Sequence, residues 1–256
     1  MDSLKSLLQL PDVASAHGEG LDTLLLYVHL LMAALFVGWF SYFVYTVFKF
    51  RKSANPKADY VGARSHFSSY AEVAVAGIEG LLLLGFAVPL WSKAVDKLPD
   101  PKKTLDIQIM AQQFQWNAHY KGADNTWGKQ DIKFASSANP FGIDVSDTGA
   151  KDDFALLREP YLVPVNKDVI CRISSMDVIH CFKVPRMRVT QDAIPGMSIP
   201  VHFRPVKTGE FMIICAQLCG NLHSTMKGTF KVVEQDEFDK WFAEKTKAGM
   251  AAAASE

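Results

Sequence analysis

The sequence has no net charge and few cysteines, and both facts exclude classes of protein. Lys and Arg number 27 and Asp and Glu also 27, so the chain lacks the basic surplus of a nucleic-acid-binding protein. Hydrophobic residues make up 49%, which excludes a largely disordered chain. Four cysteines in 256 residues are too few for a disulfide scaffold, and the lack of any Cys-x-x-Cys-His run excludes a covalently attached haem. At this length we expect one folded domain plus a further segment.

Two long apolar runs lie in the first hundred residues. Residues 24–48 carry no formal charge, and at ~1.5 Å per residue they can cross a hydrocarbon core of ~30 Å. Residues 73–91 just reach the length that a span needs and contain Glu79. One soluble core of this size would not bury both runs. The predicted transmembrane helices are residues 23–50 and 71–92.

The segment between the two runs, residues 51–70, is basic. Lys49 precedes it, and its own charged residues are Arg51, Lys52, Lys57, Arg64 and one acid, Asp59. Short loops rich in Lys and Arg stay in the cytoplasm, so both termini are predicted to face outward. Residues 14–16 (Ala-Ser-Ala) resemble a signal-peptidase site, but the apolar run before them is too short for a signal peptide. Residues 1–22 are therefore interpreted as an outer N-terminal segment.

The pattern changes after residue 100 to short β-type runs separated by Pro, Gly, Asn and Asp. This pattern predicts an all-β sandwich or barrel over residues 100–235, on the outer side. Residues 121–153 are rich in Gly, Asn, Asp and Ser and are predicted to form a surface insertion. A charged amphipathic stretch and an Ala-rich end predict a short helix and tail over residues 236–256.

One loop between two predicted strands gathers side chains that bind soft metals. It holds Cys215, Cys219, His223 and Met226, and His180 lies in an upstream loop. Thiolate, imidazole and thioether together favour copper. One thiolate, two imidazoles and an axial thioether would suffice for a mononuclear blue-copper site, which leaves Cys215 unexplained. Two bridging thiolates, with one imidazole on each of two copper ions, use the whole set.

Other interpretations of the same loop remain open. Cys and His at short spacing also make tetrahedral zinc sites, although zinc has no use for Met226. A disulfide between Cys215 and Cys219 would suit an oxidising compartment but would leave His223 without a role. Cys171 and Cys181 are expected to be buried rather than to bind metal.

The whole chain resembles subunit II of haem-copper cytochrome c oxidases. The resemblance rests on Asp177-Val-Ile-His180, the run Asp192-Ala-Ile-Pro-Gly196, and the Cys-x3-Cys-x3-His-x2-Met spacing, in the family's order. It implies a two-helix hairpin, a cupredoxin-like Greek-key barrel and a dinuclear copper centre, CuA. The metal ligands that it implies are His180, Cys215, Gln217 through its backbone carbonyl, Cys219, His223 and Met226.

The resemblance also implies a function. The subunit would accept electrons from cytochrome c and pass them to haem in subunit I, which would hold further copper, within an oxygen-reducing, proton-pumping oxidase. Its place would be the inner membrane of a bacterium, in contact with lipid, subunit I and other oxidase subunits. Two alternatives are a copper-free structural subunit of a quinol oxidase and an outer-face copper-delivery protein, and the full set of candidate ligands speaks against the first.

The sequence departs from the family pattern at two places that matter for function. Gln217 stands where the family usually has a Glu that also helps bind magnesium at the boundary with subunit I, so we expect weak or no magnesium binding. The usual Trp-Tyr-Trp run is replaced by Phe114-Gln115-Trp116. The resemblance therefore assigns electron uptake from cytochrome c to Phe114 and Trp116.

Two glutamates of the second apolar run are candidates for proton movement. A charge near the membrane centre costs ~3 kcal/mol on insertion scales and is seldom kept without a use. Glu72 and Glu79 lie seven residues apart, on one helical face, about 10 Å from each other. In the family, a Glu at the cytoplasmic start of this helix is associated with a proton pathway of subunit I, and Glu72 matches it. Glu79 has an equally simple interpretation as a packing residue against that subunit.

Overall fold

The structure is a computed structural model that describes residue 6 and residues 8–57, 60–62 and 65–253. The chain divides into two units. One unit contains Gly20–Ser92 with the first ten residues, and the other contains Pro11–Glu19 and Lys93–Glu256. Each unit is described by itself below.

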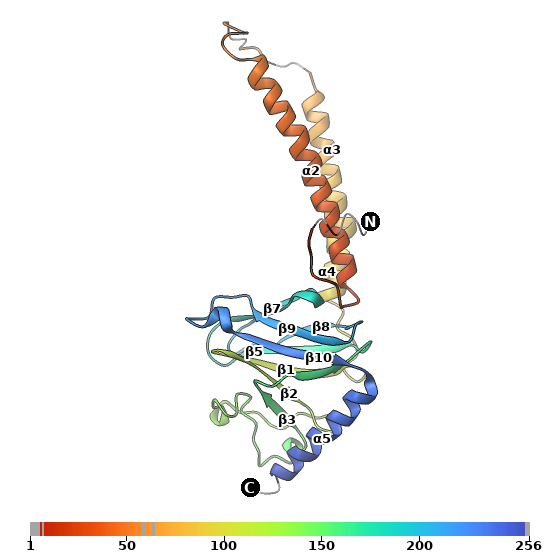
Figure 1. Cartoon of the computed structure of the whole chain (residues 1–256), viewed down its shortest axis with the longest axis vertical. Coiled ribbons are helices and arrows are strands. Elements are labelled where there is room, and N and C mark those ends of the chain that lie inside the picture. The colour runs from red at the N-terminus through yellow and green to blue at the C-terminus, as the bar shows by residue number, and fades with distance from the viewer. Residues whose placement is uncertain (1–5, 7, 58–59, 63–64, 254–256) are drawn as a thin grey trace. The chain divides into compact units, whose positions relative to one another are not determined.

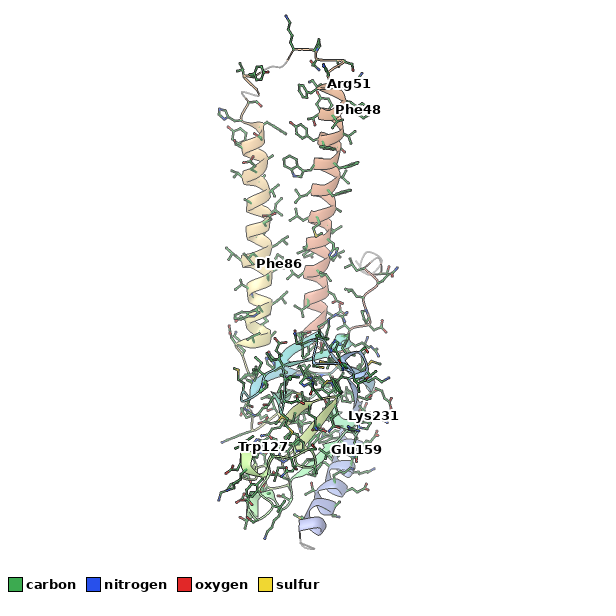
Figure 2. All side chains as sticks on the ribbon, turned by 90° about the vertical axis from the view of Figure 1, so that its left-hand side faces the viewer. Phe48, Arg51, Phe86, Trp127, Glu159 and Lys231 are labelled. Carbon is green, nitrogen blue, oxygen red and sulfur yellow. The ribbon has the colours of Figure 1, made fainter. Side chains whose placement is uncertain are left out.

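The first unit is built from two long apolar helices. α2 covers Gly18–Lys49, so it begins five residues before the predicted start. α3 covers Phe67–Leu82 and continues through a π-helical turn, η1 (Leu83–Ala87), into α4 (Val88–Val95). Figure 2 shows Phe48 and Arg51 at the end of α2 next to the connecting loop. Phe86, on the other helix, lies far from that loop.

These helices are long and apolar enough to cross a membrane, and almost none of their residues is buried. Tyr27 of α2 and Phe86 of η1 meet edge to face, with ring centroids 5.7 Å apart. Apolar faces of this extent require a cover, and the described residues of this unit do not supply it. The predicted pair of membrane helices in the fold class is confirmed.

The second unit is an all-β domain of two five-stranded sheets (Figure 1). The first sheet has the order β3-β2-β1-β5-β8 and the second the order β4-β10-β9-β6-β7. β1 runs parallel to β5 and β10 parallel to β4, while the other named neighbours are antiparallel. The strands are β1 (Leu105–Gln112), β2 (Gln115–Tyr120), β3 (Phe154–Leu157), β4 (Tyr161–Pro164), β5 (Val169–Ser175), β6 (His180–Val184), β7 (Val189–Ala193), β8 (Ile199–Phe203), β9 (Gly209–Cys215) and β10 (Lys227–Val233).

The core of this domain follows from the period of two in a strand. In β1 the alternate residues Ile107, Ile109 and Ala111 are fully buried. Phe182 and Phe230 of the other sheet are buried in the same cluster. The predicted cupredoxin-like all-β fold is confirmed, with the strands arranged as two sheets rather than as one closed barrel.

A short N-terminal segment adds to the β-domain, which the sequence did not indicate. Ala14 is fully buried, its N–H donates to the carbonyl of Arg186 at 2.8 Å, and its carbonyl accepts from Val206 at 2.8 Å. The hydroxyl of Ser15 donates to the carbonyl of Met187 at 2.7 Å. The small side chains of this segment allow the close approach. Part of the predicted outer N-terminal segment is thus integral to the second unit.

A buried carboxylate, that of Asp153, anchors the segment of residues 121–153. Asp153 accepts hydrogen bonds from the N–H groups of Gly122 and Gly128, at 2.8 and 2.9 Å. The same carboxylate lies 3.1 Å from Nε2 of His119, which is fully buried in β2. Phe141 of the segment packs against the His119 ring. The segment therefore combines an exposed surface with an anchor to the sheet.

The C-terminal helix α5 (Gln235–Ala253) packs an aromatic face on the β-domain. Phe238 is buried, and Trp241 meets Tyr120 and Phe154 edge to face, at 5.4 and 5.6 Å between centroids. Figure 1 shows the helix running alongside the end of the sheets. The helix is therefore part of the fold rather than a free tail.

Truncating Phe238 to alanine is expected to weaken this packing. Removing a buried Phe side chain typically costs about 3–5 kcal/mol of unfolding free energy. We expect Phe238→Ala to lower the melting temperature of the purified full chain clearly, while the exposed Lys240→Ala leaves it unchanged. Equal melting of the two variants would show that α5 does not stabilise the domain.

Candidate metal centre

Sheet register brings the candidate residues of the metal centre to one end of the β-domain. β6 and β9 are antiparallel, with Phe182 opposite Cys215, so His180 at the start of β6 lies beside the end of β9. The loop between β9 and β10 closes on itself, because the N–H of Cys215 donates to the carbonyl of Met226 at 3.2 Å. A short 3₁₀ turn, η5 (His223–Thr225), fills this loop.

A glycine is required in this loop. Gly220 has φ of 137°, a conformation that residues with a Cβ rarely adopt. A Cβ here would also lie 2.9 Å from Nε2 of Gln113 and 3.0 Å from the ring of Phe114. The loop therefore approaches the β1–β2 turn closely because residue 220 has no side chain.

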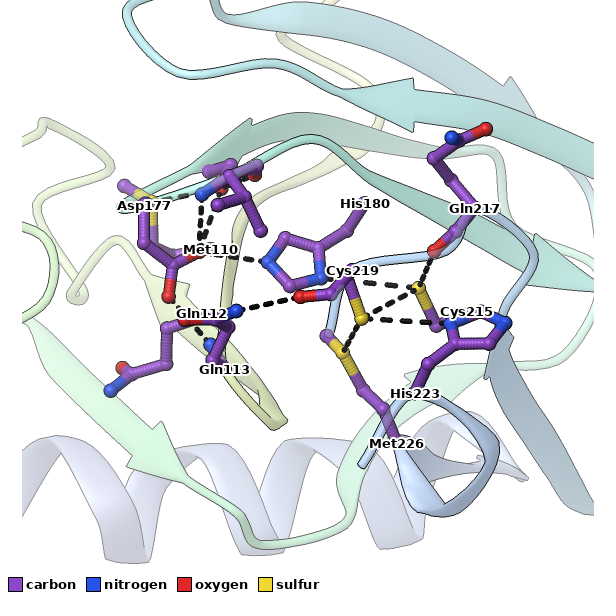
Figure 3. Close-up of polar contacts among 12 residues, drawn as sticks. Met110, Gln112, Gln113, Asp177, His180, Cys215, Gln217, Cys219, His223 and Met226 are labelled. Atoms are coloured by element: carbon purple, nitrogen blue, oxygen red, sulfur yellow. Dashed lines mark hydrogen bonds and ion pairs between the residues drawn. The ribbon is translucent and has the colours of Figure 1, made fainter. Parts of the chain in front are cut away.

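Two thiols and two imidazoles face one another where this loop meets the start of β6 (Figure 3). The Sγ atoms of Cys215 and Cys219 are 3.7 Å apart, and both residues are free thiols. Nδ1 of His180 lies 3.9 Å from Sγ of Cys215, and Nδ1 of His223 lies 3.5 Å from Sγ of Cys219. His180, Cys215 and Cys219 are buried, and their ligand atoms lie within 4.8 Å of one another. Each thiol therefore has its own imidazole.

Two weaker donors complete the cluster. Sδ of Met226 lies 3.7 Å from Sγ of Cys219, and the thioether is buried. The backbone carbonyl oxygen of Gln217 lies 3.1 Å from Sγ of Cys215. Figure 3 shows the side-chain amide of Gln217 directed away from the sulfur atoms. The cluster is thus rich in soft sulfur donors, and that chemistry fits copper better than a hard cation.

A carboxylate outside the cluster fixes one of its imidazoles. Oδ1 of Asp177 lies 2.8 Å from Nε2 of His180, which leaves Nδ1 facing the sulfur atoms. Burial alone would raise the pKa of Asp177, but hydrogen bonds from the N–H of Gln113 and from His180 hold that pKa below its ordinary value. Histidines that bind metals commonly donate their other ring N–H to a carboxylate in this way.

Gln113 links this carboxylate to the loop of the cysteines. Its backbone N–H donates to Asp177 Oδ2 at 2.7 Å, and its side-chain amide donates to the carbonyl of Cys219 at 2.6 Å. Sequence reasoning missed this residue. Its only sequence signal is its position before the aromatic run, which does not indicate where its amide points.

Two thiols at this end of the β-domain have raised pKa values. Burial, followed by the neighbouring Cys215, raises the pKa of the Cys219 thiol to about 11. Burial, followed by Asp192, raises the pKa of Cys181 to about 12. A metal bound as thiolate must therefore displace protons from this loop.

Two aromatic side chains of the β1–β2 region lie next to the cluster. Trp116 is 3% exposed, and its ring meets His180 at 6.2 Å and Phe182 at 5.5 Å between centroids. Phe114 is only partly buried and lies close to Gly220. The two residues assigned to electron uptake thus differ: one reaches the surface and the other is in the core.

The remaining candidate residues lie outside the cluster. Glu72 and Glu79 both fall on α3, and Glu79 lines an apolar groove of the helical unit together with Leu31 and Leu83. Cys171 and Cys181 are buried, as expected from the sequence. None of these four side chains contacts the sulfur atoms of Cys215 and Cys219 at hydrogen-bond distance in the described part of the chain.

Fold and site together define a β-domain with two apolar helices and a buried cluster of thiols and imidazoles that could hold a metal ion. Residues 105–233, about half of the chain, match the family described as cytochrome c oxidase subunit II, periplasmic domain. The chain belongs to the cytochrome c oxidase subunit II family, whose members form part of an oxidoreductase complex.

Individual relatives agree with this assignment. The alternative cytochrome c oxidase subunit 2 of Bradyrhizobium diazoefficiens is 30% identical over 84% of this chain and 77% of its own. Cytochrome c oxidase subunit 2 of Cereibacter sphaeroides is 28% identical over 84% of this chain and 72% of its own. The crystal structure of the periplasmic domain of subunit II of cytochrome oxidase from Bradyrhizobium japonicum is 28% identical, with a TM-score of 0.42, covering 59% of this chain and 99% of that one.

Proposed function

We propose that the chain accepts electrons from cytochrome c at a dinuclear copper centre and passes them to haem in subunit I of a proton-pumping oxidase. One observation carries the proposal: two thiols 3.7 Å apart, each with its own imidazole at 3.5–3.9 Å. A mononuclear site would leave one of the two thiols without a metal. The metal ligands would be His180, Cys215, the carbonyl of Gln217, Cys219, His223 and Met226.

The protein would keep these ligands nearly fixed through each electron transfer. Bound copper supplies a one-electron redox couple, and a ligand cage that does not move keeps the reorganisation small. Asp177 holds His180, Gln113 holds the carbonyl of Cys219, and the β-domain core excludes water from the thiols. The burial of the thiols and Met226 also speaks against a delivery protein, which needs room to release its metal.

The path of the electron into this centre would begin at Phe114. This side chain is partly exposed, whereas Trp116 is buried against His180. In this proposal cytochrome c docks over Phe114, and Trp116 lies between the docking surface and His180. The two aromatic rings would contribute through where they lie, because neither ring needs to be oxidised or reduced itself.

The proposal extends to partners and a location, and the family and the two apolar helices support it. The β-domain would lie in the periplasm of a bacterium, with both termini on that side of the inner membrane and with subunit I and lipid around α2 and α3. Glu72 would lie at the cytoplasmic start of a proton pathway of subunit I. Glu79 would lie two turns deeper in the same helix.

Spectroscopy of the copper-loaded full chain in detergent distinguishes the candidate sites. A mixed-valence electron-spin signal shared over two copper nuclei, with the optical bands of copper–thiolate bonds, is expected. A single-copper signal would indicate a blue-copper site or a delivery protein, and tight zinc binding without copper binding would indicate a structural site. Failure to bind copper at all would favour the subunit of a quinol oxidase.

A substitution at Gln217 tests two roles of this residue separately: copper binding through its backbone carbonyl and magnesium binding through its side chain. Because only its carbonyl faces the sulfur atoms, Gln217→Glu is expected to leave the copper spectrum unchanged. Hard divalent ions prefer anionic oxygen, so the Glu variant of the assembled oxidase should retain more magnesium or manganese after chelation than the wild type. Stoichiometric, chelator-resistant magnesium in the wild type would contradict this expectation.

A further inference from the structure

The connections at the metal-centre end of the β-domain carry few charged residues. The strand directions bring five connections to this end, namely residues 113–114, 158–160, 176–179, 194–198 and 216–226. The structure describes all of these residues, and Arg158, Glu159 and Asp177 are the only Lys, Arg, Asp or Glu among them. Lys227 follows directly as the first residue of β10. This end of the domain therefore has no ring of carboxylates.

Exposed apolar side chains take up much of this end instead. Leu218 is 76% exposed and Leu222 is 53% exposed. The other exposed large apolar side chains of these connections are Val178, Ile179 and Met197. Leu222 and Phe114 line a hollow of about 390 Å³ between the β1–β2 turn, the β3–β4 connection and the start of β10. Exposed apolar side chains that are concentrated in this way mark sites of protein–protein contact.

Two cations lie beside Phe114 without an acidic partner. Arg158 and Lys227 line the same hollow as Phe114, and both side chains are exposed. Nε of Arg158 donates to Oε1 of Gln115, which holds the guanidinium group next to the β1–β2 turn. Neither cation forms an ion pair with a described residue. Their charge is therefore available to a partner protein.

The two carboxylates of this end are already engaged. Glu159 pairs with Lys245 of α5 at 3.2 Å between Oε2 and Nζ. The oxygen atoms of Asp177 face two backbone N–H groups and Nε2 of His180, all at 2.7–2.8 Å. The uncompensated charge next to Phe114 is thus positive. A partner that docks here meets apolar side chains and two cations.

We propose that the electron donor docks on this surface with an acidic face, in which carboxylates surround an apolar centre. The inference rests on the proposed function, because it takes from it that cytochrome c docks over Phe114. The carboxylates of the donor would lie near Arg158 and Lys227, and its apolar centre would contact Phe114 and Leu222. Complementary charges mainly raise the rate of encounter and exclude partners of the wrong sign. A donor with a lysine-rich face would meet like charge here.

Two forms of one cytochrome c test the charge of the docking surface. The first form has a lysine-rich docking face, and the second is the same protein after succinylation, which replaces each amine by a carboxylate. Calorimetric titration of the copper-free full chain in detergent with each oxidised form measures binding without electron transfer. At ~0.01 M ionic strength, where charges act over ~30 Å, we expect the succinylated form to bind more tightly. This preference should shrink at ~0.15 M, where screening is stronger.

Variants of the two cations locate the binding surface. Lys227→Gln or Arg158→Gln should weaken binding of the succinylated form about two- to fivefold, the range of one exposed ion pair. Lys227→Glu should weaken it further, and the fold is expected to hold because Lys227 is exposed. Lys207→Gln is the matched control, since Lys207 is exposed in the β8–β9 connection at the opposite end of the sheets. The control variant should bind both forms as the wild type does.

The results also separate this inference from the proposed function. Tighter binding of the lysine-rich form, equal binding of the two forms at ~0.01 M ionic strength, or binding of neither form would overturn the inference. So would wild-type affinity for the succinylated form in the Lys227 and Arg158 variants. The proposed function would stand in each case if the copper-loaded chain gives the dinuclear signal. A chain without that signal that still prefers the succinylated form would contradict the copper centre and keep the acidic docking partner.

Discussion

Cytochrome c oxidation is expected to fall to background in the assembled oxidase when Cys219 is replaced by serine or His223 by alanine. The Cys219 thiol has three cluster contacts, because Sγ of Cys215, Nδ1 of His223 and Sδ of Met226 all lie within 3.7 Å of its sulfur. Serine cannot bridge two soft metal ions, so both electron uptake and the mixed-valence signal should disappear. Oxygen consumption with reduced cytochrome c, and copper content per chain, measure the two effects.

Cys181→Ser is the matched control for this experiment. Cys181 follows His180 directly and is buried, but its thiol pairs with Asp192 rather than with the cluster. Its serine variant should keep copper and turnover, and all three variants should insert into the membrane normally, because the sheets pack without the loop. Wild-type turnover in Cys219→Ser would contradict the copper assignment.

Copper retention is expected to fall about 10- to 100-fold when Asp177 is replaced by alanine, the usual effect of losing a carboxylate that orients a metal-binding histidine. The carboxylate accepts from both His180 and the N–H of Gln113, so its loss frees two parts of the site at once. Competition of the loaded protein with a copper chelator measures the change.

Asp177→Asn provides the graded comparison. The amide oxygen of Asn can still accept a hydrogen bond from Nε2 of His180. It lacks the negative charge that makes the hydrogen bond to a carboxylate stronger. We expect an intermediate copper affinity and a dinuclear spectrum close to that of the wild type. A loss in Asp177→Asn equal to the loss in Asp177→Ala would mean that charge, and not orientation, is the contribution of this residue. Unchanged affinity in both would contradict the role in positioning.

The fold class could be predicted from the sequence because its signals are local. Uncharged apolar runs and alternating strands can be recognised within about twenty residues. The additional strand-like segment at Ala14 and Ser15 could not, since its partners Arg186 and Val206 lie far away in the sequence. The packing of the aromatic face of α5 on the β-domain could not be predicted either, because amphipathic spacing does not say which surface a helix covers.

The candidate site was predictable where donor chemistry and spacing coincide. Cys215, Cys219, His223 and Met226 share one loop, and the need for a second imidazole pointed to His180 in an upstream loop. Gln113 escaped notice because its role depends on a close approach to the loop at Gly220, which is a tertiary contact.

The hydrogen bonds of Ala14 have a consequence for how the chain is assembled in a membrane. This residue precedes both apolar helices, whereas its partners Arg186 and Val206 follow them. Hydrogen-bonded partners must occupy the same aqueous compartment, so the chain between them has to cross the bilayer an even number of times. The β-domain also cannot close until residue 206 has been synthesised and has reached the compartment of an N-terminal segment that was made first.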